Sequence, residues 1–163
     1  IVVDPDNGDI FISDGYGNRR VVVFDKNGNF LRQWGRQATE AEIVAGTPGT
    51  FANTVHCIAM NNSGEIYVCD RFGDRIQVFN KMGGYLRSIH IGEKTHSRGT
   101  AWSVAFSPDL EQEYLYVVNG GWEKIEILKK SFHSMGVDTI EINTDGSLAE
   151  PIIRYFKMRE KRH

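Results

Sequence analysis

The sequence lacks long apolar runs, has few cysteines and carries no strong charge of either sign. No stretch approaches the ~20 apolar residues that a membrane-spanning helix needs, so no transmembrane segment is predicted. Its two cysteines, Cys57 and Cys69, are too few to define a disulfide framework, and each lies in an apolar strand pattern, where a buried thiol behaves as a small hydrophobe. A formal net charge of -2 provides no basic surface, so we expect no nucleic-acid partner. We recognise no signal sequence before the strand pattern that begins at Ile1, and two cysteines do not indicate a redox compartment, so the sequence leaves the compartment open.

What the chain does contain is a repeating unit, and an internal repeat is the strongest sequence signal of fold class. Each copy consists of short strands rich in β-branched and aromatic residues, separated by turns such as Asp6-Asn7-Gly8, where glycine or asparagine accepts a positive φ. The equivalent residues Asp14, Asp70 and Asn119 lie 56 and 49 positions apart, a spacing that suits one propeller blade plus a variable loop. The sequence therefore predicts an all-β fold, a β-propeller.

The repeat predicts a single incomplete propeller domain of about three blades and a partial fourth. The expected parts are a blade at 1–35, a loop at 36–54, blades at 55–92 and 101–130, a partial or decayed blade at 131–158 and a basic tail at 159–163. The stretch from Asp138 to Leu148 resembles the opening hairpin of the fourth blade, but Pro151 would interrupt its central ladder. Three blades cannot close a ring, so we expect a fragment of a six-bladed ring, or self-association that covers the open blade edges.

One polar pattern recurs after the second strand of each copy. An acidic or amide residue (Asp14, Asp70 or Asn119) is followed within a few positions by Asn18-Arg19-Arg20, Asp74-Arg75 or Glu123-Lys124. The carboxylate can accept hydrogen bonds from turn amides while the cation pairs across the hairpin, which is a structural role.

Three residues depart from the repeat where propeller sites usually gather, around the central channel. His56 precedes the innermost strand of the second blade, and Tyr16 and Arg71 lie in equivalent turns of neighbouring blades. Taken singly, each has a structural interpretation: a hydrogen-bonded histidine, a half-buried turn aromatic and a solvated or turn-pairing cation. The tryptophans, including Trp102, are assigned to packing between the blades.

Two segments carry a more specific signal. The first is Ser13-Asp14-Gly15-Tyr16-Gly17-Asn18-Arg19-Arg20-Val21-Val22-Val23-Phe24. The second is Cys69-Asp70-Arg71-Phe72-Gly73-Asp74-Arg75-Ile76-Gln77-Val78-Phe79. Between them lies the strand pattern Val55-His56-Cys57-Ile58-Ala59-Met60. In order and spacing, roughly the first 80 residues resemble the peptidyl-α-hydroxyglycine α-amidating lyases (PAL) and related bacterial NHL-repeat proteins. The resemblance implies a six-bladed NHL propeller and a secreted or extracytoplasmic location.

The resemblance also implies a chemistry and the residues that perform it. Tyr16 would be the catalytic base, His56 one of three zinc ligands, and Arg71 the residue that binds or polarises the substrate, a hemiaminal that splits into an amide and glyoxylate. A phenol, with a pKa of about 10, is a poor base at neutral pH unless nearby cations lower that pKa, and zinc and guanidinium are such cations. Calcium is a second candidate ion in a complete ring.

The expected metal site is incomplete in this chain. A catalytic zinc takes about three protein ligands, and His90, His96 and His133 lack the sequence setting of the family's other ligands. The chain alone is therefore expected to be inactive. The alternative, from a different functional class, is a non-catalytic NHL module that binds a peptide or protein on one face of the propeller.

Overall fold

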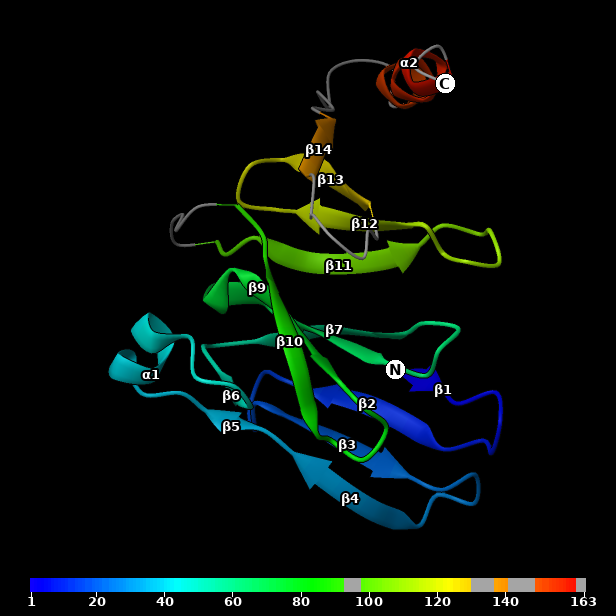
Figure 1. Cartoon of the computed structure of the whole chain (residues 1–163). Coiled ribbons are helices and arrows are strands. Elements are labelled where there is room, and N and C mark those ends of the chain that lie inside the picture. Colours follow the sequence, from blue (N-terminus) through cyan, green and yellow to red (C-terminus); the bar gives the residue numbers. More distant parts are fainter. Residues whose placement is uncertain (93–97, 130–136, 141–148, 161–163) are drawn as a thin grey trace.

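A computed structural model describes residues 1–92, 98–129, 137–140 and 149–160, and the all-β NHL-type propeller fold is confirmed (Figure 1). The strands form three four-stranded antiparallel sheets, one for each blade. The first contains β1 (Val2–Val3), β2 (Ile10–Asp14), β3 (Arg20–Phe24) and β4 (Phe30–Trp34); the second contains β7 (Val55–Met60), β8 (Ile66–Asp70), β9 (Arg75–Phe79) and β10 (Tyr85–His90); the third contains β11 (Ala101–Phe106), β12 (Tyr114–Asn119), β13 (Lys124–Lys129) and β14 (Val137–Ile140).

The hydrophobic core lies between the blades. One buried cluster, which includes Phe11, Phe51 and Val68, joins the first blade to the second. Another, which includes Ile76 and Val117, joins the second to the third. The middle blade is covered on both faces, which explains why all residues of β8 and β9 are buried rather than alternating between buried and exposed.

The C-terminal part differs from the expected partial fourth blade. Val137–Ile140, part of which was assigned to a new hairpin, instead pairs with β13 as the outermost strand of the third blade. The next described element is the helix α2 (Ala149–Glu160), which contains the first two residues of the basic tail expected at 159–163; the other three lie outside the described residues. Pro151 is compatible with this helix because the first-turn N–H groups have no intrahelical acceptor. On α2, Ile152 and Phe156 pack against the apolar face of the third blade.

The 36–54 loop between the first two blades is ordered by local hydrogen bonds. It contains β5 (Arg36–Gln37), the short helix α1 (Glu40–Ala45) and β6 (Thr50–Phe51), and β5 pairs with β6 in parallel. Thr39 caps α1, and Glu42 accepts a return hydrogen bond from the Thr39 backbone, which forms a capping box. Neither described helix has the length and apolar character to cross a membrane.

The two cysteines form a disulfide, so the prediction of two buried thiols was wrong. Cys57 on β7 is bonded to Cys69 on β8, with the two Cα atoms 4.9 Å apart. A β-bulge explains the pairing: Val55 lies opposite Asp70 and Ile58 opposite Val68, so that His56 and Cys57 together face Cys69. The bulge is a feature of strand register that the apolar pattern does not reveal.

The predicted acid–cation pair is present in the first two blades. Asp14 and Arg20 are cross-strand partners joined at 2.8 Å, as are Asp70 and Arg75. In the third blade Asn119 instead donates to Glu126 at 2.6 Å. The two acid–cation pairs differ mainly in burial, because the Asp14 side chain is 31% exposed and that of Asp70 is fully buried.

We predict that Asp70→Ala destabilises the chain far more than Asp14→Ala. Loss of the buried carboxylate leaves the Arg75 cation unpaired inside the protein, at a cost of about 3–5 kcal/mol, whereas a half-exposed ion pair contributes about 1 kcal/mol or less. Urea unfolding of the two variants measures the difference. Equal losses would contradict the proposed importance of burial at this repeat position.

Acid should destabilise the second blade, because it protonates the Glu65 carboxylate. Two hydrogen bonds from Arg87 lower the pKa of Glu65 to about 2, and Asn61 and the Tyr67 hydroxyl also donate to it. Because the folded pKa lies below the unfolded value of 4.5, this stabilisation is complete above about pH 4.5 and is lost as the pH falls toward 2.

The variant Glu65→Gln should remove part of that pH dependence. We expect the loss of unfolding free energy between pH 5 and pH 2 to shrink by about 1–2 kcal/mol, after allowance for the solvent around Arg87. The control is Glu111→Gln, at an exposed position. Parallel pH profiles for wild type and Glu65→Gln would refute the assignment.

Candidate functional site

The three predicted site residues lie along one rim of the propeller, where the turns after the second strands meet the starts of the first strands. Tyr16 is in the β2–β3 turn, Arg71 opens the 3₁₀ turn η1 (Arg71–Gly73), and His56 is the second residue of β7. The rings of Tyr16 and His56 lie 6.3 Å apart. The structure therefore brings Tyr16 and His56 together, and Arg71 is joined to them through a fourth residue, Trp102.

Two backbone features of the repeat place these side chains. The last turn residue before β3, β9 and β13 is left-handed although it is not glycine, at Arg19, Asp74 and Glu123 with φ of 52°, 51° and 53°. In the first turn, Gly15 lies so close to β7 that an added Cβ would stand 2.0 Å from the Val55 carbonyl oxygen. Glycine at position 15 therefore allows the turn that carries Tyr16 to reach the strand that carries His56.

His56 has the hydrogen bonding of a metal-ligating histidine. Its Nδ1 lies 2.6 Å from the carbonyl oxygen of Trp102, on the neighbouring blade. A carbonyl oxygen only accepts, so Nδ1 carries the proton and neutral His56 keeps its lone pair on Nε2. In metal sites the non-ligating ring nitrogen commonly donates to such a carbonyl, which fixes the ring and the tautomer.

Arg71 is held by two aromatic rings and a carbonyl group. The centre of its guanidinium lies 4.3 Å from the Trp102 ring centroid and 4.9 Å from that of Phe72. Its Nε donates to the Arg98 carbonyl oxygen at 2.8 Å. Within the described part of the chain its two Nη groups have no hydrogen-bond acceptor, so they are available to an anion.

Tyr16 is the most accessible of the three side chains. It is 74% exposed, and its hydroxyl has no hydrogen-bond partner among the described residues. The arrangement thus presents a phenol, an imidazole Nε2 and a guanidinium edge along one rim, which are a potential base, a metal ligand and an anion receptor.

The described residues do not complete a metal site. Across residues 1–92, 98–129, 137–140 and 149–160, no group of three or more His, Cys, Asp or Glu side chains could hold a metal ion. His90 lies exposed at the end of β10, and His96 and His133 lie outside the described residues. His56 thus fits zinc as a single ligand.

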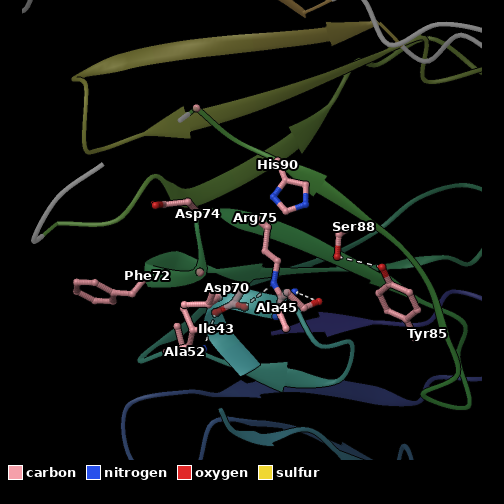
Figure 2. Close-up of a pocket in the computed structure, with 14 residues that line it drawn as sticks. Ile43, Ala45, Ala52, Asp70, Phe72, Asp74, Arg75, Tyr85, Ser88 and His90 are labelled. Carbon is pink, nitrogen blue, oxygen red and sulfur yellow. Dashed lines mark hydrogen bonds and ion pairs between the residues drawn. The ribbon is translucent and has the colours of Figure 1, made fainter. Parts of the chain in front are cut away.

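A separate cavity of about 370 Å³ lies between α1 and β10. Figure 2 shows Asp70 and Arg75 at its base and, on β10, Tyr85 joined to Ser88 by a hydrogen bond. Tyr16, His56 and Arg71 do not line it.

Burial raises the pKa of Asp70, while the Ala52 N–H, Arg75 and Gln77 oppose that rise. This carboxylate has three donors around it and acts as a structural group.

Trp102 is the residue that sequence reasoning missed. It was assigned to blade packing, yet it contacts Arg71 by its ring and His56 by its carbonyl. Aligning the first strands of the second and third blades would have shown the signal, because Trp102 occupies the repeat position of His56. By contrast, Trp34 does pack between blades, against Phe11 and Phe79.

We predict that Gly15→Ala disturbs this rim and Gly17→Ala does not. The new methyl at position 15 meets the Val55 backbone, and such overpacking costs about 1–3 kcal/mol, whereas nothing lies within 4 Å of a Cβ at position 17. Chemical unfolding measures the cost, and the His56 imidazole NMR signals report displacement. If both variants match wild type, Gly15 does not set the approach of the two blades.

Comparison with known proteins shows that the chain is similar to amidating enzymes and to an NHL-repeat protein. No protein-family model matches it. It is 33% identical over 121 residues to Peptidyl-glycine alpha-amidating monooxygenase B of Xenopus laevis, which covers 74% of the chain and 13% of the relative. Identity to Peptidyl-alpha-hydroxyglycine alpha-amidating lyase 1 of Drosophila melanogaster is 24% over 131 residues, or 80% of the chain and 24% of the relative.

A third relative has a broader name. Identity to the human NHL repeat-containing protein 3 is 29% over 125 residues, which is 76% of the chain and 33% of that protein. The chain thus spans about an eighth of the frog protein and no more than a third of the other two. Together with the three four-stranded sheets, these matches identify the chain as an NHL-repeat β-propeller of the group that resembles the peptidyl-α-hydroxyglycine α-amidating lyases.

Proposed function

We propose that this rim forms part of a zinc-dependent lyase site that cleaves a peptidyl-α-hydroxyglycine into a peptide amide and glyoxylate. The observation that carries the proposal is the hydrogen bond between His56 Nδ1 and the Trp102 carbonyl oxygen, which leaves Nε2 for a metal ion. The Tyr16 ring lies 6.3 Å from the His56 ring. Names of relatives such as the fly lyase support the substrate class.

The reaction suits the residues present. Tyr16, as phenolate, accepts the proton of the substrate hydroxyl. The C–O bond then becomes a carbonyl as the C–N bond breaks, and the proton held by Tyr16 passes to the leaving nitrogen, which restores the phenolate. Electrons and atoms balance without an oxidant, because the hemiaminal simply divides into amide and aldehyde. Arg71 binds the glycine carboxylate through its Nη groups. Zinc, when bound through His56 and further ligands, supplies Lewis-acid polarisation of the substrate oxygen.

The remaining zinc ligands belong, in this proposal, to blades beyond the described residues. Three ligands and an open position define a catalytic zinc site, and the described residues contribute His56. The much greater length of the relatives supports a larger ring as the active unit.

A second candidate function is a non-catalytic module that binds a peptide or protein. It is favoured by the cavity beside α1, whose wall includes the exposed Ile43 and Val44. If Val44→Asp abolishes the binding of a peptide or protein and His56→Ala leaves that binding unchanged, the result would favour this function over the lyase.

The zinc content of the full-length protein tests the metal ligand. We predict about one zinc per molecule in wild type and at least a tenfold loss of zinc affinity in His56→Ala. His90→Ala, at an exposed histidine of the same blade, is the matched control and should keep wild-type affinity. A metal-free wild type, or full zinc affinity in His56→Ala, would contradict the proposal.

Turnover tests the base. With benzoyl-α-hydroxyglycine as substrate and glyoxylate release as readout, Tyr16→Phe should lower kcat by about 10²–10⁴-fold with little change in KM. Tyr85→Phe removes a hydroxyl that bonds to Ser88, away from the rim, and should retain wild-type kcat. Wild-type kcat in Tyr16→Phe would exclude Tyr16 as the base.

A further inference from the structure

The third blade contributes to the rim at the same repeat position as His56. In β11, Ala101 pairs with Asn119 and Ser103 with Val118, so that Trp102 is the extra residue of a bulge. The bulge of β7 contains His56. Neighbouring first strands thus carry the same irregularity, and their two aromatic side chains meet, with the rings 6.0 Å apart.

The indole ring of Trp102 is fixed in place by its own blade. Its Nε1 donates to the carbonyl oxygens of Gly99 at 3.0 Å and Arg98 at 3.2 Å. The ring lies so close to Gly120 that an added Cβ there would stand 2.0 Å from Cε2. A ring whose single N–H forms a bifurcated hydrogen bond, and which lies against a glycine, has little freedom to turn.

The carbonyl group of Arg98 also links Trp102 to Arg71. The Arg98 oxygen accepts from Trp102 Nε1 and also from Arg71 Nε, at 2.8 Å. Since the guanidinium also contacts the indole at 4.3 Å, one carbonyl and one ring together fix the direction in which Arg71 presents its Nη groups. A preorganised guanidinium loses less side-chain entropy on binding, which favours bidentate capture of a carboxylate.

We infer that Trp102 is a positioning residue that holds Arg71 as a receptor for the carboxylate of the ligand. The inference rests on the proposed function for the identity of that carboxylate, the glycine end of the substrate. Trp102 itself makes no bond to the reacting atoms. Its indole stacks on the guanidinium, and this cation–π contact disappears when the ring is removed.

The test measures binding of stable, unreactive probes to the full chain by calorimetry. Hippurate carries the carboxylate, and hippuramide is its neutral counterpart. We expect wild type to bind hippurate at least tenfold more tightly than hippuramide.

The Trp102 variants test the inference. Trp102→Ala should weaken hippurate binding about tenfold and leave hippuramide binding unchanged. Trp102→Phe keeps a ring, and its affinity for hippurate should stay within about threefold of wild type. Phe30→Ala removes an exposed ring on β4 and is the control for loss of an aromatic side chain.

A double-mutant cycle separates positioning from a general structural role. In an Arg71→Lys background, Trp102→Ala should weaken hippurate binding by less than about twofold, because the group that Trp102 orients is already gone. Equal weakening of both probes by Trp102→Ala, an undiminished effect in Arg71→Lys, or a wild type that does not prefer hippurate would each overturn the inference. Because the probes are not cleaved, the inference can stand if lyase turnover is absent, and it can fail if turnover is present.

Discussion

The structure depends on the ion pair that closes the hairpin between the second and third strands in each of the first two blades. In the second blade this pair is Asp70 with Arg75, fully buried and supported by further hydrogen bonds. Arg75 also donates to the carbonyl oxygens of Gly46, Thr47 and Thr50, so the same cation holds the long loop between the first two blades. Because the turn that carries Arg71 begins directly after Asp70, the ion pair fixes where the candidate site is built.

The rim follows from this constraint and from the bulges of the neighbouring first strands. Each bulge adds one residue at the start of the strand, and the chain uses that residue for His56 in one blade and Trp102 in the next. The carbonyl of the second bulge residue orients the imidazole of the first. Adjacent blades thus orient one another's side chains, so a structural repeat can carry a candidate site that no single blade contains.

Much of the fold could be predicted from the sequence, because strand periodicity and turn residues are local signals. The repeat predicted the blades and the acid–cation pairs, and the pairs formed by Asp14 and Asp70 are present. The predictions failed where strand register or long-range packing decided the outcome. The Cys57–Cys69 disulfide arises from a bulge, and Val137–Ile140 completes an existing sheet, which no local pattern distinguishes from opening a new one.

Part of the candidate site could also be predicted, although from a resemblance to a family and not from local periodicity. The family resemblance named Tyr16, His56 and Arg71, and the structure places all three on one rim. The role of Trp102 could not be read from its own neighbourhood, because its contacts reach Arg71 and His56 in another blade. Apolar and aromatic patterns report burial, and a half-buried tryptophan that stacks on a cation has the same sequence signature as one that packs in a core.

The central claim is that His56 bonds through Nδ1 and has no hydrogen-bond partner for Nε2 among the described residues, so that Nε2 can bind a ligand. Long-range ¹H–¹⁵N NMR of the histidine side chains, recorded where His56 is neutral and without added metal, reports the tautomer directly. The account predicts a proton on Nδ1, hydrogen-bonded to the Trp102 carbonyl, and an unprotonated Nε2. A proton on Nε2 of neutral His56 would contradict it, because the imidazole would then have no lone pair to offer a ligand at the rim.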